Sequence, residues 1–128
     1  MYFFVSHHHT NIKEANICLN CPQAVWKNSK CLLCPALGKP TADRSACEEH
    51  YLATNNIYYA CDNASHNPAS TEQECDTCGE GVRIWRSVYK DCISCNYSSA
   101  LISKKAECLE CDNRYWTGTN ENSGYCYL

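Results

Sequence analysis

Residues 75–95 read CDTCGEGVRIWRSVYKDCISC, and this stretch decides what kind of fold the chain can adopt. Two C-x2-C pairs flank a single tryptophan. The same order recurs in residues 18–34 and again in residues 108–126, where the second pair is reduced to one cysteine. All three tryptophans of the chain occupy this slot. Self-similarity at a period of about 30 residues is typical of stacked repeat proteins, so we interpret the chain as a series of repeat units.

A fourth, degenerate copy fills the gap between the first two intact ones. Cys47-Glu-Glu-His50 stands for its first pair, Ile57-Tyr58-Tyr59 for its aromatic slot and Cys61-Asp-Asn-Ala64 for its second pair. Each copy is too short to bury a core alone, so neighbouring copies are expected to stack. The predicted divisions are an N-terminal tail (1–9), unit 1 (10–40), degenerate unit 2 (41–68), unit 3 (69–101) and a truncated unit 4 (102–128).

The composition argues against a conventional hydrophobic core. Thirteen of the 128 residues are cysteine, whereas Phe occurs twice and Met once. So high a cysteine content is typical of a disulfide scaffold, in which covalent links substitute for apolar burial. We therefore expect a small disulfide-rich fold. It is predicted to be an elongated array of four short cysteine-rich repeats, with single helical turns, short hairpins and little regular structure.

The segment ahead of each first cysteine carries helix signals. Thr71 and Glu74 have the spacing of a capping box, and Asn11 and Glu14 share that spacing. The stretch around each tryptophan contains turn residues such as Asn28-Ser29, which favour a hairpin. Each unit is thus predicted to be one helical turn followed by a hairpin.

The degenerate copy also bears on disulfide pairing. With Cys47 taken as its first cysteine and Cys61 as its third, the second and fourth are missing together, which suggests that those two positions are bonded to each other. The rule first-to-third and second-to-fourth leaves only Cys111 unpaired, because its partner would lie one position past the last residue. The predicted bridges are Cys18–Cys31, Cys21–Cys34, Cys47–Cys61, Cys75–Cys92, Cys78–Cys95 and Cys108–Cys126.

Aromatic residues stand between the two cysteine pairs of every unit. A ring at this place can pack over the disulfides as the miniature core of its unit, and we prefer that role to stacking on a ligand. The predicted core aromatics are Trp26, Tyr58, Trp85 and Trp116.

Charge, hydropathy and motifs exclude several classes of function. A net charge of −3 with scattered Lys and Arg does not provide the basic surface that nucleic acid requires. No apolar run approaches the roughly 18 residues of a membrane helix, so no membrane span is expected. The chain has no nucleophile-elbow, metalloprotease or phosphate-loop motif. We read His7-His8-His9 as a solvated tail, and we expect no enzyme activity, no metal and no cofactor.

Zinc ribbons also use paired C-x2-C motifs, which place four thiolates around one ion. Residues 18–34 fit that pattern, but unit 2 offers only Cys47, Cys61 and His50 as ligands. The alternative prediction is therefore an intracellular zinc-binding interaction module. We prefer disulfides.

The alternation of C-x2-C pairs with one aromatic residue over residues 18–126 resembles growth-factor-receptor-type, or furin-like, cysteine-rich repeats. Protist variant surface antigens and bacterial cysteine-rich surface proteins look similar. The resemblance implies rod-like extracellular modules, commonly with first-to-third and second-to-fourth disulfides. We therefore predict a non-enzymatic extracellular or cell-surface module for display, adhesion or contact with a protein or glycan ligand.

Overall fold

A computed structural model describes residues 12–98 and 101–128 of the chain. Its regular elements are all short. They are α1 (Ala15–Cys18), β1 (Ala24–Lys27), β2 (Lys30–Leu33), β3 (His50–Leu52), β4 (Tyr58–Ala60), β5 (His66–Pro68), α2 (Glu72–Asp76), β6 (Arg83–Arg86), β7 (Asp91–Ser94), α3 (Lys105–Cys108), β8 (Tyr115–Asn120) and β9 (Ser123–Tyr127).

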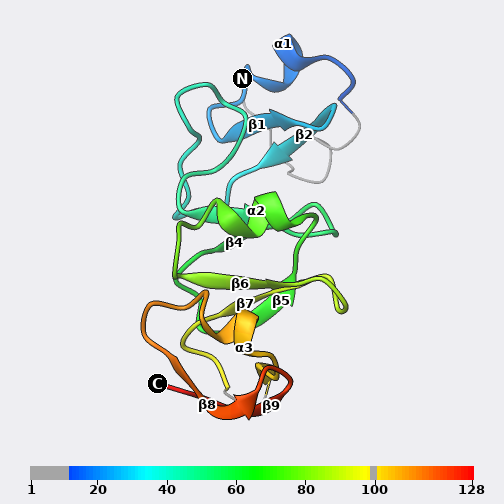
Figure 1. Cartoon of the computed structure of the whole chain (residues 1–128). Coiled ribbons are helices and arrows are strands. Elements are labelled where there is room, and N and C mark those ends of the chain that lie inside the picture. Colours follow the sequence, from blue (N-terminus) through cyan, green and yellow to red (C-terminus); the bar gives the residue numbers. More distant parts are fainter. Residues whose placement is uncertain (1–11, 99–100) are drawn as a thin grey trace.

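The strands pair into antiparallel hairpins, which we number along the chain. Hairpin 1 is β1–β2, hairpin 2 is β3–β4, hairpin 3 is β6–β7 and hairpin 4 is β8–β9; β5 adds a third strand to hairpin 3 on the β7 side. Figure 1 shows the hairpins following one another from the N-terminal end at the top to the C-terminal end at the bottom. The fold is therefore small, disulfide-rich and built from short hairpins and helical turns, as the composition predicts.

A helical turn precedes each of hairpins 1, 3 and 4 and carries the first cysteine of a C-x2-C pair. Cys18 ends α1, Cys75 lies in α2 and Cys108 ends α3, and all three are buried. In α2 the hydroxyl of Thr71 accepts a hydrogen bond from the backbone N–H of Glu74, as the capping signal predicts. Asn11, the other expected cap, lies outside the described residues.

The hairpins share one register. Trp26 pairs with Cys31, Trp85 with Cys92 and Trp116 with Cys126. Because successive side chains of a strand point to opposite faces, the neighbouring cross-strand pair lies on the other face of each hairpin. This outer pair is Val25–Leu32 in hairpin 1, Tyr51–Tyr59 in hairpin 2, Ile84–Ile93 in hairpin 3 and Tyr115–Tyr127 in hairpin 4.

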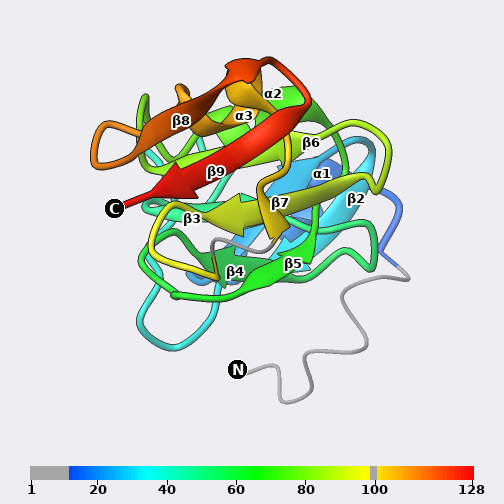
Figure 2. The ribbon, with the colours of Figure 1, turned by 60° about the horizontal axis from the view of Figure 1, so that its bottom comes forward.

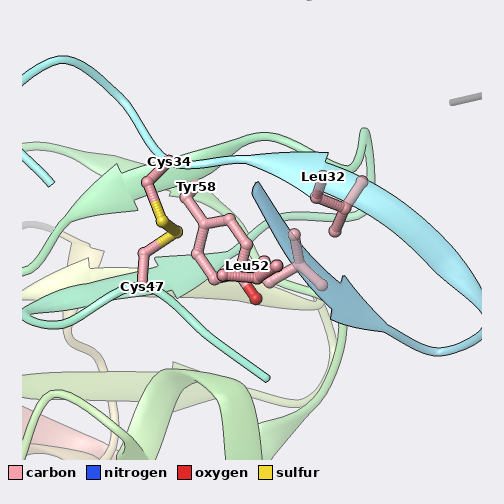
Figure 3. Packing of buried hydrophobic residues seen from close by; sticks show 6 residues of the cluster. Leu32, Cys34, Cys47, Leu52 and Tyr58 are labelled. Carbon is pink, nitrogen blue, oxygen red and sulfur yellow. A yellow bond between two sulfur atoms is a disulfide. The ribbon is translucent and has the colours of Figure 1, made fainter. Parts of the chain in front are cut away.

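Several small apolar clusters take the place of one central core in the described residues. In one of them Leu32 and Cys34, from hairpin 1 and the residue after it, pack against Leu52 and Tyr58 of hairpin 2. Figure 3 shows the ring of Tyr58 beside the disulfide between Cys34 and Cys47. Such a cluster spans two consecutive hairpins, so each hairpin depends on its neighbour for burial.

Candidate functional site

The six disulfides fall into two classes. Helix bridges join the cysteine of a helical turn to the hairpin that follows it: Cys18–Cys31, Cys75–Cys92 and Cys108–Cys126. Linking bridges join the end of one hairpin to the segment just before the next hairpin: Cys34–Cys47, Cys61–Cys78 and Cys95–Cys111. Together they connect all four hairpins covalently.

Three bridges expected from the first-to-third rule are present as the helix bridges, but the fourth bridge expected from that rule and both bridges expected from the second-to-fourth rule are wrong. Cys21 is not bonded to Cys34, Cys47 is not bonded to Cys61, and Cys78 is not bonded to Cys95. The physical reason is that the two cysteines of a C-x2-C pair point toward different hairpins. The first cysteine of a pair points into its own hairpin, while the second lies after the helical turn and reaches back to the preceding hairpin, as Cys78 does to Cys61.

The unpaired cysteine is also different from the predicted one. Cys111 is bonded to Cys95, and Cys21 is the free thiol. Cys21 is half-buried and packs against the cluster that includes Cys18 and Trp26.

The pairing corrects the alignment of the degenerate unit. Cys47 is bonded to the end of the preceding hairpin, as Cys111 is, so it is a second cysteine. Cys61 lies two residues after Tyr59 of the outer pair, as Cys95 lies two residues after Ile93, so it is a fourth cysteine. In the predicted repeat alignment the missing cysteines of residues 41–68 are therefore the first and the third, at the positions of Arg44 and Tyr58.

The three tryptophans share one kind of environment. Trp26, Trp85 and Trp116 are partly buried against clusters that contain the helix bridge of their own hairpin. In hairpin 2 the cross-strand pair Leu52–Tyr58 replaces the Trp–Cys pair, so Leu52 and not Tyr58 takes the tryptophan position. Tyr58 is buried without a hydrogen-bond partner for its hydroxyl. Burial first, and the charge of Glu74 second, raise its pKa.

Two buried arginines, which the sequence analysis did not predict, fix hairpins 3 and 4 to the backbone before each of them. The guanidinium of Arg83 donates to the carbonyl oxygens of Cys61 at 3.1 Å, Asn63 at 2.7 Å and Ser65 at 2.7 Å. Burial lowers its pKa. Arg114 donates to the carbonyl oxygens of Cys95 at 2.7 Å and of Tyr97.

A sequence signal for this role exists, because each of these arginines lies two residues before a tryptophan. Hairpin 1 has Ala24 at that position. There Arg44, which comes after hairpin 1 in the chain, donates to the carbonyl oxygens of Cys21 and Ala24, both at 2.7 Å.

An acidic cleft of about 560 Å³ lies between the loop after α2 and the loop after α3. Partial burial first, then the carboxylates of Asp76, Glu72 and Glu107, raise the pKa of Glu110 to about 6. Four carboxylates and one arginine line the cleft. Its lining residues are Asp76, Gly79, Glu80, Gly81, Arg83, Leu109, Glu110 and Asp112.

No group of three or more His, Cys, Asp or Glu side chains is arranged to hold a metal ion in residues 12–98 and 101–128. Nor does this part of the chain contain a helix long and apolar enough to cross a membrane. The predicted histidine tail, His7-His8-His9, lies outside the described residues.

Comparison with protein-family models, with curated proteins and with solved structures found no significant match to the chain.

Proposed function

We propose that the chain is an extracellular or cell-surface cysteine-rich module, non-enzymatic, that serves as a stapled scaffold for display, adhesion or ligand contact. In this proposal it is an elongated array of four repeat units, similar in kind to furin-like repeats. The linking bridges differ from the second-to-fourth pairs that this resemblance implies. A protein or glycan is the expected ligand.

The observation that carries the proposal is the alternation of helix bridges and linking bridges. Twelve of the thirteen cysteines are used in bridges, and every hairpin is tied to the next. Such dense cross-linking is typical of small proteins that work in oxidising compartments. Disulfide bridges between consecutive hairpins hold the small apolar clusters in a fixed order without a large core.

The intracellular zinc module is the second candidate, and the pairing weighs against it. A zinc ribbon needs both thiolates of each C-x2-C pair at one ion. Here the members of a pair serve different bridges: Cys75 joins Cys92, while Cys78 joins Cys61.

Intact mass measured before and after reduction of the natively folded protein tests the proposal. Six bridges require a gain of two hydrogens each, or about twelve mass units. Stoichiometric zinc together with thirteen free thiols would overturn the extracellular proposal. Alkylation in non-denaturing buffer should label Cys21 alone.

A further inference from the structure

Hairpins 2 and 4 carry the same tyrosine pair at the same register. Tyr51 lies opposite Tyr59, and Tyr115 lies opposite Tyr127. The ring centroids are 6.1 Å apart with planes at 35° in hairpin 2, and 5.6 Å apart with planes at 34° in hairpin 4. The two outer pairs thus present nearly the same aromatic surface.

The surroundings of the two pairs differ. Tyr51 is fully buried, whereas Tyr115 is 54% and Tyr127 is 45% exposed. Figure 2 brings hairpin 4 forward and shows β8 and β9 at one end of the series of hairpins. The same aromatic pair is therefore an internal contact in one place and a free surface in the other.

The cover of Tyr51 comes from the segment between Cys61 and Ser94. Ala69 and the bridged Cys75 and Cys92 pack against the ring. The guanidinium carbon of Arg83 lies 4.7 Å from the ring centroid, and Nη2 of Arg83 donates to the tyrosine hydroxyl at 3.3 Å. A small residue, a helix bridge and an arginine thus make up the cover.

The outer pairs of hairpins 1 and 3 are also covered from the following segment. Val25 and Leu32 pack against Leu52, and Ile84 packs against Ile102 and Cys108. Three of the four outer pairs are thus covered by the unit that follows. The fourth pair, Tyr115–Tyr127, consists of two tyrosines, as does Tyr51–Tyr59, the pair that contacts an arginine.

We propose that the Tyr115–Tyr127 pair is a docking face for a further cysteine-rich unit of the kind that covers Tyr51. The occupant places an arginine over the ring of Tyr115, as Arg83 lies over the ring of Tyr51. A second copy of this chain does not fit, because its first hairpin has Ala24 where Arg83 stands in hairpin 3. The inference rests on the repeat array proposed above.

The test joins a copy of residues 61–94 directly after Leu128 of the full chain. This copy contains both of its own bridges, Cys61–Cys78 and Cys75–Cys92. After alkylation of Cys21, tyrosine nitration is measured residue by residue in the chain with and without the added copy. Nitration of Tyr115 should fall to the level of the buried Tyr51, while the nitrated fraction of the exposed Tyr89, which the extended chain contains twice, should stay unchanged.

Matched variants show whether the tyrosines direct the docking. Tyr115→Asp should leave Tyr127 reactive in the extended chain and should hinder formation of the two added bridges. Val88→Asp, an exposed site in the turn of hairpin 3, should have neither effect. Arg83→Met in the added copy alone should restore part of the nitration of Tyr115.

Every other outcome counts against the docking face. If the added bridges form but Tyr115 stays as reactive as before, the face is not a docking site for such a unit. Bridges that fail to form, or that form equally well with Tyr115→Asp, also contradict it, because the same segment assembles on Tyr51. Concentration-dependent protection of Tyr115 in the unextended chain would identify a second copy as the occupant instead. All of these results leave the six-bridge mass test of the proposed function unaffected.

Discussion

Hairpins 2 and 3 are neighbours in the chain but are stabilised in different ways. Hairpin 3 follows a helical turn and has a helix bridge, Cys75–Cys92, with Trp85 packed against it. In the described residues hairpin 2 has neither a helix before it nor a bridge of its own. Its covalent ties are the two linking bridges on either side, Cys34–Cys47 and Cys61–Cys78.

The difference shows which bridge the fold can do without. In the described residues hairpin 2 has no helical turn before it and no cysteine at the positions that match Cys75 and Cys92 of hairpin 3. Tyr58 stands at the position that matches Cys92 and lies in a buried cluster, and Arg44 donates to the carbonyl oxygens of Cys21 and Ala24. Packing can therefore replace a helix bridge, whereas every junction between consecutive hairpins keeps its linking bridge.

Removal of a linking bridge should have the largest effect. Replacing Cys34 and Cys47 by Ser leaves hairpin 2 with one covalent tie, and it puts two polar groups into a buried cluster. Loss of a native bridge of this loop size should lower the free energy of unfolding by about 3 to 5 kcal/mol, as measured by urea denaturation. Cys21→Ser, which breaks no bridge, is the control. A loss below about 1 kcal/mol would mean that packing alone holds this junction.

Arg83→Met should have the next largest effect, because it leaves the carbonyl oxygens of Cys61, Asn63 and Ser65 without their donor. A buried acceptor without a partner costs about 1 to 3 kcal/mol. We expect a total loss of about 2 to 3 kcal/mol, because water can reach the more exposed carbonyls. His50 holds the matching position in hairpin 2, and His50→Ala should change the stability by less than about 0.5 kcal/mol. Equal losses in the two variants would contradict the role of the arginine.

Gly81→Ala should destabilise hairpin 3 moderately. Gly81 has a φ of 78°, and a Cβ there would lie 2.2 Å from Cγ of Asp112. The left-handed backbone should cost about 1 to 2 kcal/mol, while the exposed Asp112 side chain can move aside. Thermal unfolding measures the loss, with Glu80→Ala in the same loop as the control. A variant as stable as the parent protein would show that the loop can rearrange.

Tyr58→Phe should have the smallest effect at neutral pH, because the buried hydroxyl has no hydrogen-bond partner. We expect a change below about 1 kcal/mol, in the stabilising direction. The folded protein raises the pKa of Tyr58 above its unfolded value near 10. Its contribution to stability is therefore complete below about pH 10 and is lost as the pH rises further.

The variant should consequently lose less stability than the parent protein between about pH 10 and pH 11. Both proteins should carry Cys21→Ser, because a free thiolate would exchange with the disulfides at high pH. Parallel stability curves for the two proteins would contradict the burial of an unpaired hydroxyl at Tyr58.

Much of the local structure could be predicted from spacing. Thr71 and Glu74 identified the start of α2, and the Trp slots identified hairpins 1, 3 and 4. The degenerate unit was aligned wrongly because its sequence allows two readings: Cys47 can be the first cysteine of a pair that ends at His50, or the second of a pair that begins at Arg44. The bridge from Cys47 to Cys34 and the position of Cys61 relative to the outer pair Tyr51–Tyr59 distinguish them.

The sequence by itself determined the class of fold, since thirteen cysteines in 128 residues with few core formers require covalent stabilisation. It also determined the helix bridges, because the first and third cysteines lie on elements that are adjacent in the chain. The linking bridges and the arginine contacts were decided by the tertiary structure alone. They depend on how one hairpin stacks on the next, and the direction in which Cys78 or Arg83 points is not encoded in the spacing within a single unit.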